Sequence, residues 1–176
     1  MPPEKKYESD GGPGLEELAT ILRQSQTPEE DMATLLKAQL LFWMLRAIDG
    51  HAKNFSIALL PNNGFHLTPL YDVLSAWPAV GDGPNQWTRH ELKLAMAVRG
   101  SSGKHYKCAQ IMRRHFNQTA RKLGHAADME PLIEETLSQV DPAIEIVSSL
   151  LPPGFSERVS QSIFDGLRES AKQLAD

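Results

Sequence analysis

A long apolar stripe in the first third of the chain restricts the fold more than any other feature. It follows the sequence TPEE, in which Thr27 can cap a helix, Pro28 suits the first turn and Glu30 can complete a capping box. Seven apolar residues then recur at helical spacing: Met32, Leu35, Leu36, Leu40, Trp43, Met44 and Ala47. Such a stripe is typical of a helix that packs into a core. We therefore predict a long central helix that ends between Ile48 and Gly50.

A β-hairpin is predicted directly after this helix. The sequences FSIALL and FHLTPL have the composition of strands, and Asn63-Gly64 between them is a strong turn signal. The polar sequence DGHAKN, residues 49–54, lies between the helix and the hairpin. Because a hairpin brings its two ends together, we expect Asp72, just past the return strand, to lie near Asp49 and Asn54.

The rest of the chain is predicted to be mainly helical. Residues 1–14 are rich in Pro, Gly and charge and are expected to form an extended segment or loop. Helices are expected over residues 15–24, 91–98, 104–123, 128–137, 141–151 and 156–174. The helix over 104–123 would bury one apolar face and expose a basic one. The predicted fold class is mainly α with one small hairpin.

Charge and cysteine content exclude several classes of protein. The 176 residues carry a formal charge of −4, so a nucleic-acid partner would need a local basic patch. The single cysteine, Cys108, excludes an internal disulfide framework and a cysteine-rich zinc site, and it suits a reducing cytosol. No apolar run reaches transmembrane length, and MPPEKKYESDGG lacks the apolar core of a secretion signal. We expect a cytoplasmic protein without a membrane segment.

The polar cluster between helix and hairpin has the residue types that phosphoryl transfer requires. One carboxylate can accept the proton of an attacking hydroxyl, while an amide oxygen and a second carboxylate can hold Mg²⁺. Asp49 and Asn54 have the D-x-x-x-x-N spacing of a protein-kinase catalytic loop, and Asp72 follows after a hairpin, as the metal-binding aspartate does there. His51 and Lys53 could steady the transferring phosphate.

Several structural interpretations remain open for the same residues. Asp49 and Gly50 could form only a helix-ending turn, Asn54 could cap a strand, and Asp72 could be the N-cap of a short helix over 73–77. His51 together with Asp49 could bind a transition metal.

Longer sequence motifs add a family resemblance. The stretches KYESDGGPG, FWMLRAIDGHAKNFSI, LTPLYDVLSAWP and ELKLAM resemble the C-terminal kinase lobe of the HipA family, and the resemblance extends over essentially the whole chain. Members of this family are serine/threonine kinases that act as toxins of bacterial toxin–antitoxin pairs. The resemblance implies that residues 1–176 form the helical C-lobe of a protein-kinase-like fold, in which the hairpin carries the catalytic loop. It implies Mg²⁺ and ATP as cofactors.

The resemblance also implies a role for each residue of the loop. Asp49 would be the catalytic base, and Asn54 and Asp72 would bind magnesium. His51 or Lys53 would donate to the transferring phosphate. The nucleotide side would be lined by His51, Ala52, Lys53, Asn54, Tyr71 and Asp72.

The partners that the resemblance implies are proteins and, through them, DNA. Family members phosphorylate aminoacyl-tRNA synthetases, which causes growth arrest and persistence, and they bind a helix-turn-helix antitoxin similar to HipB. Arg121, with Lys122 beside it, would contact operator DNA only within the antitoxin complex; a solvated basic face is the alternative. The N-terminal lobe with its Gly-rich loop is not recognisable in this sequence. The isolated chain is therefore expected to be inactive or weakly active, or to need a separate N-lobe protein. The alternative function is a catalytically idle lobe that binds the antitoxin–DNA complex.

Overall fold

The computed structural model describes residues 5–175, so the expectation for residues 1–4 lies outside the described part. The helices and strands are α1 (Leu15–Leu22), α2 (Pro28–Leu45), β1 (Ile57–Leu59), β2 (Phe65–Leu67), β3 (Lys93–Gly100), β4 (Gly103–Lys107), α3 (Arg113–Lys122), α4 (Glu130–Ser138), α5 (Val140–Leu150) and α6 (Glu157–Ala175). The mainly helical fold class is confirmed. No helix within residues 5–175 is both long and apolar enough to cross a membrane.

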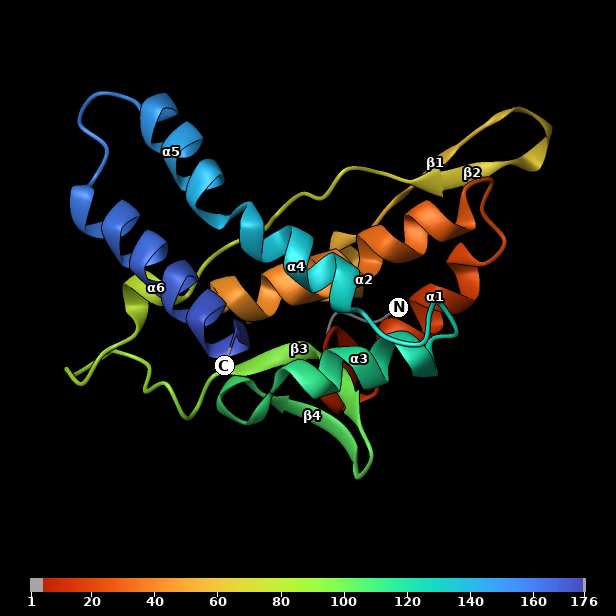
Figure 1. Ribbon diagram of the computed structural model, residues 1–176, viewed down its shortest axis with the longest axis horizontal. Coiled ribbons are helices and arrows are strands. Elements are labelled where there is room, and N and C mark those ends of the chain that lie inside the picture. The colour runs from red at the N-terminus through yellow and green to blue at the C-terminus, as the bar shows by residue number, and fades with distance from the viewer. Residues whose placement is uncertain (1–4, 176) are drawn as a thin grey trace.

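Helix α2 lies at the centre of the molecule, and α1, α4, α6 and β3 pack around it (Figure 1). Every one of the seven apolar residues of the predicted stripe is buried, but the predicted end of the helix is wrong, because α2 ends at Leu45 and Ala47 follows its C-cap. The burial extends to other faces of the helix, as Ala38 and Phe42 show, and this is typical of a helix inside a core. The capping box predicted at Thr27 is wrong, since the Thr27 side chain makes no cap hydrogen bond.

Polar side chains of α2 bind backbone groups of its neighbours. Gln39 donates from Nε2 to the Met96 carbonyl in β3 over 2.8 Å, and Trp43 donates from Nε1 to the Cys108 carbonyl over 2.9 Å. A buried polar group costs free energy unless it is hydrogen-bonded. These bonds therefore fix the β3–β4 hairpin on one side of α2.

The first hairpin, β1–β2, lies beside the N-terminal half of α2. Its antiparallel register pairs Ile57 with Leu67 and Leu59 with Phe65. The buried carboxylate of Asp31 in α2 accepts a hydrogen bond from the Leu67 backbone over 3.1 Å. The hairpin predicted from the sequence is thus confirmed, and α2 holds its return strand.

A second hairpin replaces two predicted helical segments. Residues 91–98 were expected to form a helix and instead enter β3, while 104–107 belong to β4, so that only Arg113–Lys122 of the helix expected over 104–123 is observed. All five residues from Leu94 to Val98 are buried, because α3 packs on β3 and the segment around Glu8 also contacts it. Burial on both faces removes the alternation that marks a strand in a sequence.

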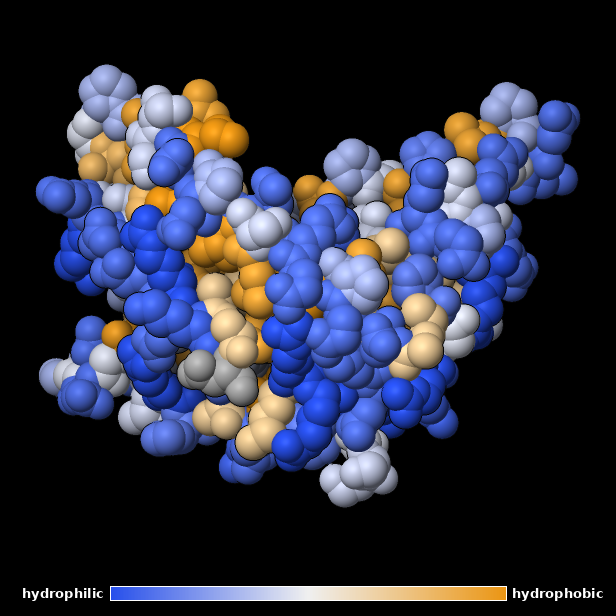
Figure 2. Space-filling model, in the orientation of Figure 1, coloured by the Kyte–Doolittle hydropathy of each residue, from blue (hydrophilic) through white to orange (hydrophobic). Residues whose placement is uncertain are grey.

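Helices α4, α5 and α6 complete the fold on the other side of α2. Asp128 accepts a hydrogen bond from the Glu130 backbone at the start of α4, as the predicted cap would. Helices α5 and α6 form an arm at the upper left of Figure 1. Figure 2 shows apolar surface along the end of this arm, where Ile146, Val147 and Leu150 are exposed.

Candidate active site

The loop that carries the candidate residues begins where α2 ends. Arg46 adopts a left-handed conformation (φ 54°), and the Ala47 N–H bonds back to the Phe42 carbonyl over 2.8 Å, so that α2 ends in a Schellman-type cap. Gly50 then lies against the Phe42 ring, where a Cβ atom would come within 2.5 Å of a ring carbon. The close approach explains the glycine and fixes the position of the loop against the core.

A short 3-10 turn, Ala52–Asn54, follows directly. The Asn54 side chain is buried and accepts a hydrogen bond from the His51 backbone through Oδ1 over 3.0 Å. It therefore closes the 3-10 turn, which is a different role from the strand cap considered as an alternative for this residue. Its amide nitrogen remains for another partner.

That partner is Asp72. Asn54 Nδ2 donates to Asp72 Oδ2 over 2.7 Å, so the expected approach of these two residues is observed. Asp72 has a φ of 55°, an uncommon conformation for a residue other than glycine. Residues 73–76 are not helical, so the alternative of Asp72 as a helix N-cap is wrong.

The Asp49 carboxylate lies among three donor side chains. Lys6 Nζ and Tyr7 OH each lie 2.7 Å from Asp49 Oδ1, and His51 Nε2 lies 4.0 Å from the same oxygen. Partial burial raises the pKa of the Asp49 carboxyl, but the hydrogen bonds from Lys6 and Tyr7 outweigh burial, so that the pKa lies below its usual range. Asp49 is therefore ionised at neutral pH.

The other residues predicted to line the nucleotide side differ in exposure: some are buried in the loop and others are exposed to solvent. His51 and Ala52 are buried, and within residues 5–175 the ring atom Nδ1 of His51 has no hydrogen-bond partner. Tyr71 is partly exposed, and its hydroxyl donates to the Lys53 carbonyl over 3.0 Å and lies 2.7 Å from Ser56 Oγ. Tyr71 and Asp72 therefore both bind back onto the loop, whereas the Lys53 side chain is exposed.

The donor atoms at Asn54 and Asp72 suit a hard cation. Mg²⁺ is commonly held by one or two carboxylates, with waters and substrate phosphates completing its coordination, so one amide oxygen and one carboxylate fit it. No group of three or more His, Cys, Asp or Glu side chains gathers in the described residues. The transition-metal alternative at His51 and Asp49 thus gains no third ligand of these types there.

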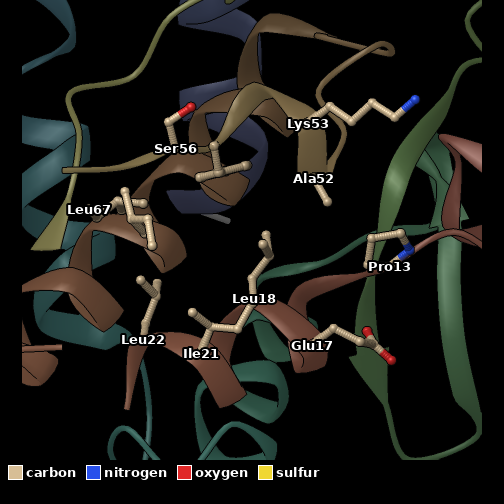
Figure 3. Close-up of a pocket in the computed structure, with 11 residues that line it drawn as sticks. Pro13, Glu17, Leu18, Ile21, Leu22, Ala52, Lys53, Ser56 and Leu67 are labelled. Carbon is tan, nitrogen blue, oxygen red and sulfur yellow. The ribbon is translucent and has the colours of Figure 1, made fainter. Parts of the chain in front are cut away.

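A cavity of about 450 Å³ opens beside the loop and is mainly apolar (Figure 3). Leu18, Ile21 and Leu22 of α1 form one wall, and Ala52 points toward them from the loop, while Ser56 borders the cavity just before β1. Further lining residues are Pro13, Glu17, Lys53, Phe55, Ile57 and Leu67. The cavity therefore shares two predicted site residues, Ala52 and Lys53, with the loop.

The two residues predicted to contact DNA lie elsewhere. Arg121 and Lys122 belong to α3 and border a hollow of about 630 Å³, together with Arg99, Gln118 and the β3–β4 turn. Arg121 Nε also donates to the Ala127 carbonyl over 3.1 Å. The hollow is basic, and its lining residues are all different from those of the candidate loop.

The sequence interpretation missed Lys6 and Tyr7. Both lie in KYESDGGPG, which was interpreted as an extended segment and as part of a family motif, without a role for either residue. No periodicity connects them with Asp49, which follows 43 and 42 positions later. The family motif was the one signal that could have drawn attention to them.

The chain is similar to known proteins. A family model described as "HipA-like C-terminal domain" matches residues 1–144. The curated protein "Putative kinase Y4mE" of Sinorhizobium fredii is 32% identical over 155 residues, which cover 86% of this chain and 33% of that protein. The chain thus spans about a third of the length of this relative.

A solved structure is also similar. It is the complex of HipA, HipB and operator DNA of the Shewanella oneidensis MR-1 toxin–antitoxin system, matched with a TM-score of 0.77 and 18% identity. The match covers 99% of this chain and 41% of the chain in that structure. At this level of identity the likeness shows the fold.

Proposed function

Because the chain belongs to the HipA-like C-terminal domain family, we propose that it is the catalytic lobe of a HipA-type serine/threonine kinase. The reaction is transfer of the γ-phosphate of Mg-ATP to a serine or threonine hydroxyl of a protein. One observation carries the proposal: the Asn54–Asp72 hydrogen bond joins the D-x-x-x-x-N loop to the aspartate beyond the hairpin. This is the arrangement that kinase chemistry needs.

Asp49 is the proposed catalytic base. Its ionised carboxylate orients the attacking hydroxyl and accepts its proton. Oδ1 is occupied by Lys6 and Tyr7, and within residues 5–175 no hydrogen bond reaches Oδ2. Oδ2 is therefore the atom that receives the substrate hydroxyl.

Asn54 and Asp72 are the proposed magnesium ligands. Bound Mg-ATP supplies the phosphoryl group and the charge that offsets its oxygens. Asn54 Nδ2 faces Asp72 and Oδ1 accepts from the His51 backbone, so ion binding would require the amide to turn its oxygen toward the exposed Asp72 carboxylate. The hydrogen bond between the two side chains keeps both groups in one place before the ion arrives.

The surrounding residues form the phosphate side of the nucleotide site. His51 and Lys53 are the donors proposed for the transferring phosphate, and Ala52 borders the apolar cavity beside them. Tyr71 holds the loop through the Lys53 carbonyl. This hydrogen bond fixes the position of the Tyr71 side chain next to Asp72.

The whole-protein activity involves more than this lobe. Residues 1–176 correspond to one lobe. A second lobe, which binds the nucleotide, acts with it, either as a separate protein or as a further part of the polypeptide. The proposed partner is a helix-turn-helix antitoxin like HipB, since the similar structure is a HipA, HipB and DNA complex. The protein substrate is a cytoplasmic protein such as an aminoacyl-tRNA synthetase, and its phosphorylation causes growth arrest and persistence.

The test is phosphate transfer from radiolabelled Mg-ATP, with the chain alone and with the products of neighbouring genes. Asp49→Asn should abolish transfer, because an amide cannot accept the proton. Asp82→Asn is the matched control, since Asp82 is exposed and lies outside the site. Phosphate transfer by Asp49→Asn at the wild-type level would contradict the proposed mechanism.

A second function is favoured by the basic hollow. Arg99, Arg121 and Lys122 border a concave surface that suits phosphate groups. A lobe without activity would use it to bind DNA within an antitoxin complex. In a gel-shift assay with antitoxin and operator, Arg121→Gln would weaken the ternary complex and reduce its salt dependence, and Asp49→Asn would leave both unchanged.

A further inference from the structure

We propose that Lys6 and Tyr7 belong to the catalytic centre as positioning residues, which hold the Asp49 carboxylate in one orientation and bring to it a cation from a remote segment. The inference rests on the proposed function of Asp49. It assigns a role to two residues that lie 43 and 42 positions before the loop.

Two short hydrogen bonds converge on one oxygen. Lys6 Nζ and Tyr7 OH both lie 2.7 Å from Asp49 Oδ1. Two donors at one oxygen restrict rotation of the carboxylate, so that Oδ2 is presented on the opposite side. The Asp49 side chain is 43% exposed, which leaves Oδ2 accessible to a substrate hydroxyl.

Lys6 also brings to the Asp49 carboxylate a positive charge that the loop itself does not supply. Two residues after Asp49 the loop has His51, whose Nε2 lies 4.0 Å from Asp49 Oδ1 and which is charged only when protonated. Lys53 is exposed and, as Figure 3 shows, its side chain extends away from the cavity. Lys6 therefore provides a permanent cation at the carboxylate.

Lys6, Tyr7 and His51 form one packed group over Asp49. Lys6 Nζ lies 4.7 Å from the centroid of the Tyr7 ring, and the Tyr7 ring lies 6.2 Å from the His51 ring. A cation over an aromatic face is attracted by it. Each member thus limits the movement of the next.

The segment that carries Lys6 and Tyr7 is itself anchored. The Glu8 side chain is 6% exposed; it accepts a hydrogen bond from the Ala97 backbone over 2.6 Å and pairs with Lys104 over 2.7 Å. A Cβ atom on Gly14 would come within 2.3 Å of the Glu8 carboxyl carbon, so glycine there leaves room for it. The two donors therefore reach Asp49 from a fixed backbone.

The test measures the Asp49 carboxyl by ¹³C NMR titration, with its signal assigned by loss in Asp49→Asn. Lys6→Met and Tyr7→Phe should each raise the Asp49 pKa, because each removes a donor to the ionised form. Lys6→Arg should keep it low. Lys5→Met is the matched control, since Lys5 is exposed and has no ion pair among the described residues. An unchanged Asp49 pKa in Lys6→Met overturns the inference.

Phosphate transfer separates this inference from the proposed function. In active protein, Lys6→Met should lower kcat by about 10- to 100-fold through misplacement of the base. It should leave KM for Mg-ATP nearly unchanged and move the acid limb of the rate profile to higher pH. An unchanged kcat and pH profile overturns the positioning role. If wild type transfers no phosphate while Lys6→Met still raises the Asp49 pKa, the proposed function fails, but the inference that Lys6 holds the Asp49 carboxylate stands.

Discussion

The Asn54 side chain donates a hydrogen bond from Nδ2 to Asp72 Oδ2 over 2.7 Å and thereby joins two parts of the chain that the β1–β2 hairpin separates. Its Oδ1 at the same time accepts from the His51 backbone. One buried amide therefore sets both the shape of the loop and the position of the carboxylate beyond the hairpin. Substitutions at the two ends of this bond should have different effects.

Asp72→Asn should affect ligand binding much more than folding. Asparagine tolerates the left-handed backbone of residue 72 and keeps a carbonyl acceptor for Asn54, so stability should change by less than about 0.5 kcal/mol in urea denaturation. Loss of the carboxylate should reduce Mg²⁺-dependent ATP binding by about tenfold or more, as measured by calorimetry of the chain with its partner lobe. Asp82→Asn serves as the exposed control. Wild-type affinity in Asp72→Asn would exclude residue 72 as a metal ligand.

Asn54→Ala should instead destabilise the fold. It removes the hydrogen bonds to Asp72 and to the His51 N–H, which keeps the Asp49 carbonyl as its other acceptor, and each lost bond costs about 0.5–1.5 kcal/mol. Asn54→Asp keeps an acceptor but places a second carboxylate beside Asp72, so its stability deficit should shrink when the pH is lowered and one carboxylate is protonated. Urea denaturation at pH 7 and pH 4 measures both effects, and equal deficits of Asn54→Asp at the two pH values would contradict the predicted repulsion.

The ion-pair network between α3 and α4 should contribute to acid sensitivity. Hydrogen bonds from Arg113 and Asn117 lower the pKa of the Glu130 carboxyl. A carboxyl whose pKa is lower in the folded state contributes stability that is fully present above its unfolded pKa, about 4.3 for glutamate, and that is lost as the pH falls through the folded pKa. Glu130→Gln should therefore flatten the stability profile below pH 5, whereas Glu145→Gln, at an exposed site, should not. Thermal melts at several pH values test this.

Gly166→Ala in α6 should destabilise the protein although alanine favours helices. A Cβ atom at residue 166 would come within 2.2 Å of the Trp77 ring. Trp77 is fixed, because its Nε1 donates to the Met44 carbonyl at the end of α2 over 2.8 Å. Overpacking costs about 1–3 kcal/mol and exceeds the gain in helix propensity of about 1 kcal/mol. Urea denaturation should show a net loss, and Lys172→Ala on the exposed side of α6 should show none.

Much of this architecture is readable in local sequence patterns. The stripe from Met32 to Ala47 predicted the central helix, and Asn63-Gly64 predicted the first hairpin. The approach of Asp72 to Asn54 followed from the geometry of that hairpin. These features depend on neighbours in the sequence, so periodicity and turn chemistry indicate them.

The second hairpin depends on distant parts of the chain. The sequence from Glu91 to Val98 consists largely of residues that favour a helix, such as Leu, Lys, Ala and Met. Its strand conformation is stabilised by packing from α3 and by the Glu8 carboxylate, which accepts from the Ala97 backbone. Tertiary contacts therefore override local propensity, and they also explain why the contacts of Lys6 and Tyr7 with Asp49 were not predicted.

The anchoring of Glu8 on β3 and β4 has a consequence for protein engineering. The candidate loop cannot be transferred by itself, because the side chains that hold Asp49 come from a segment more than 40 residues upstream. That segment is in turn bound to β3 through Glu8. A graft of residues 49–72 into another scaffold would carry the loop and the hairpin without Lys6 and Tyr7. An engineered transplant, chimera or circular permutant therefore has to keep three parts together: the loop, the β3–β4 hairpin and the segment with Lys6, Tyr7 and Glu8 that is bound to this hairpin.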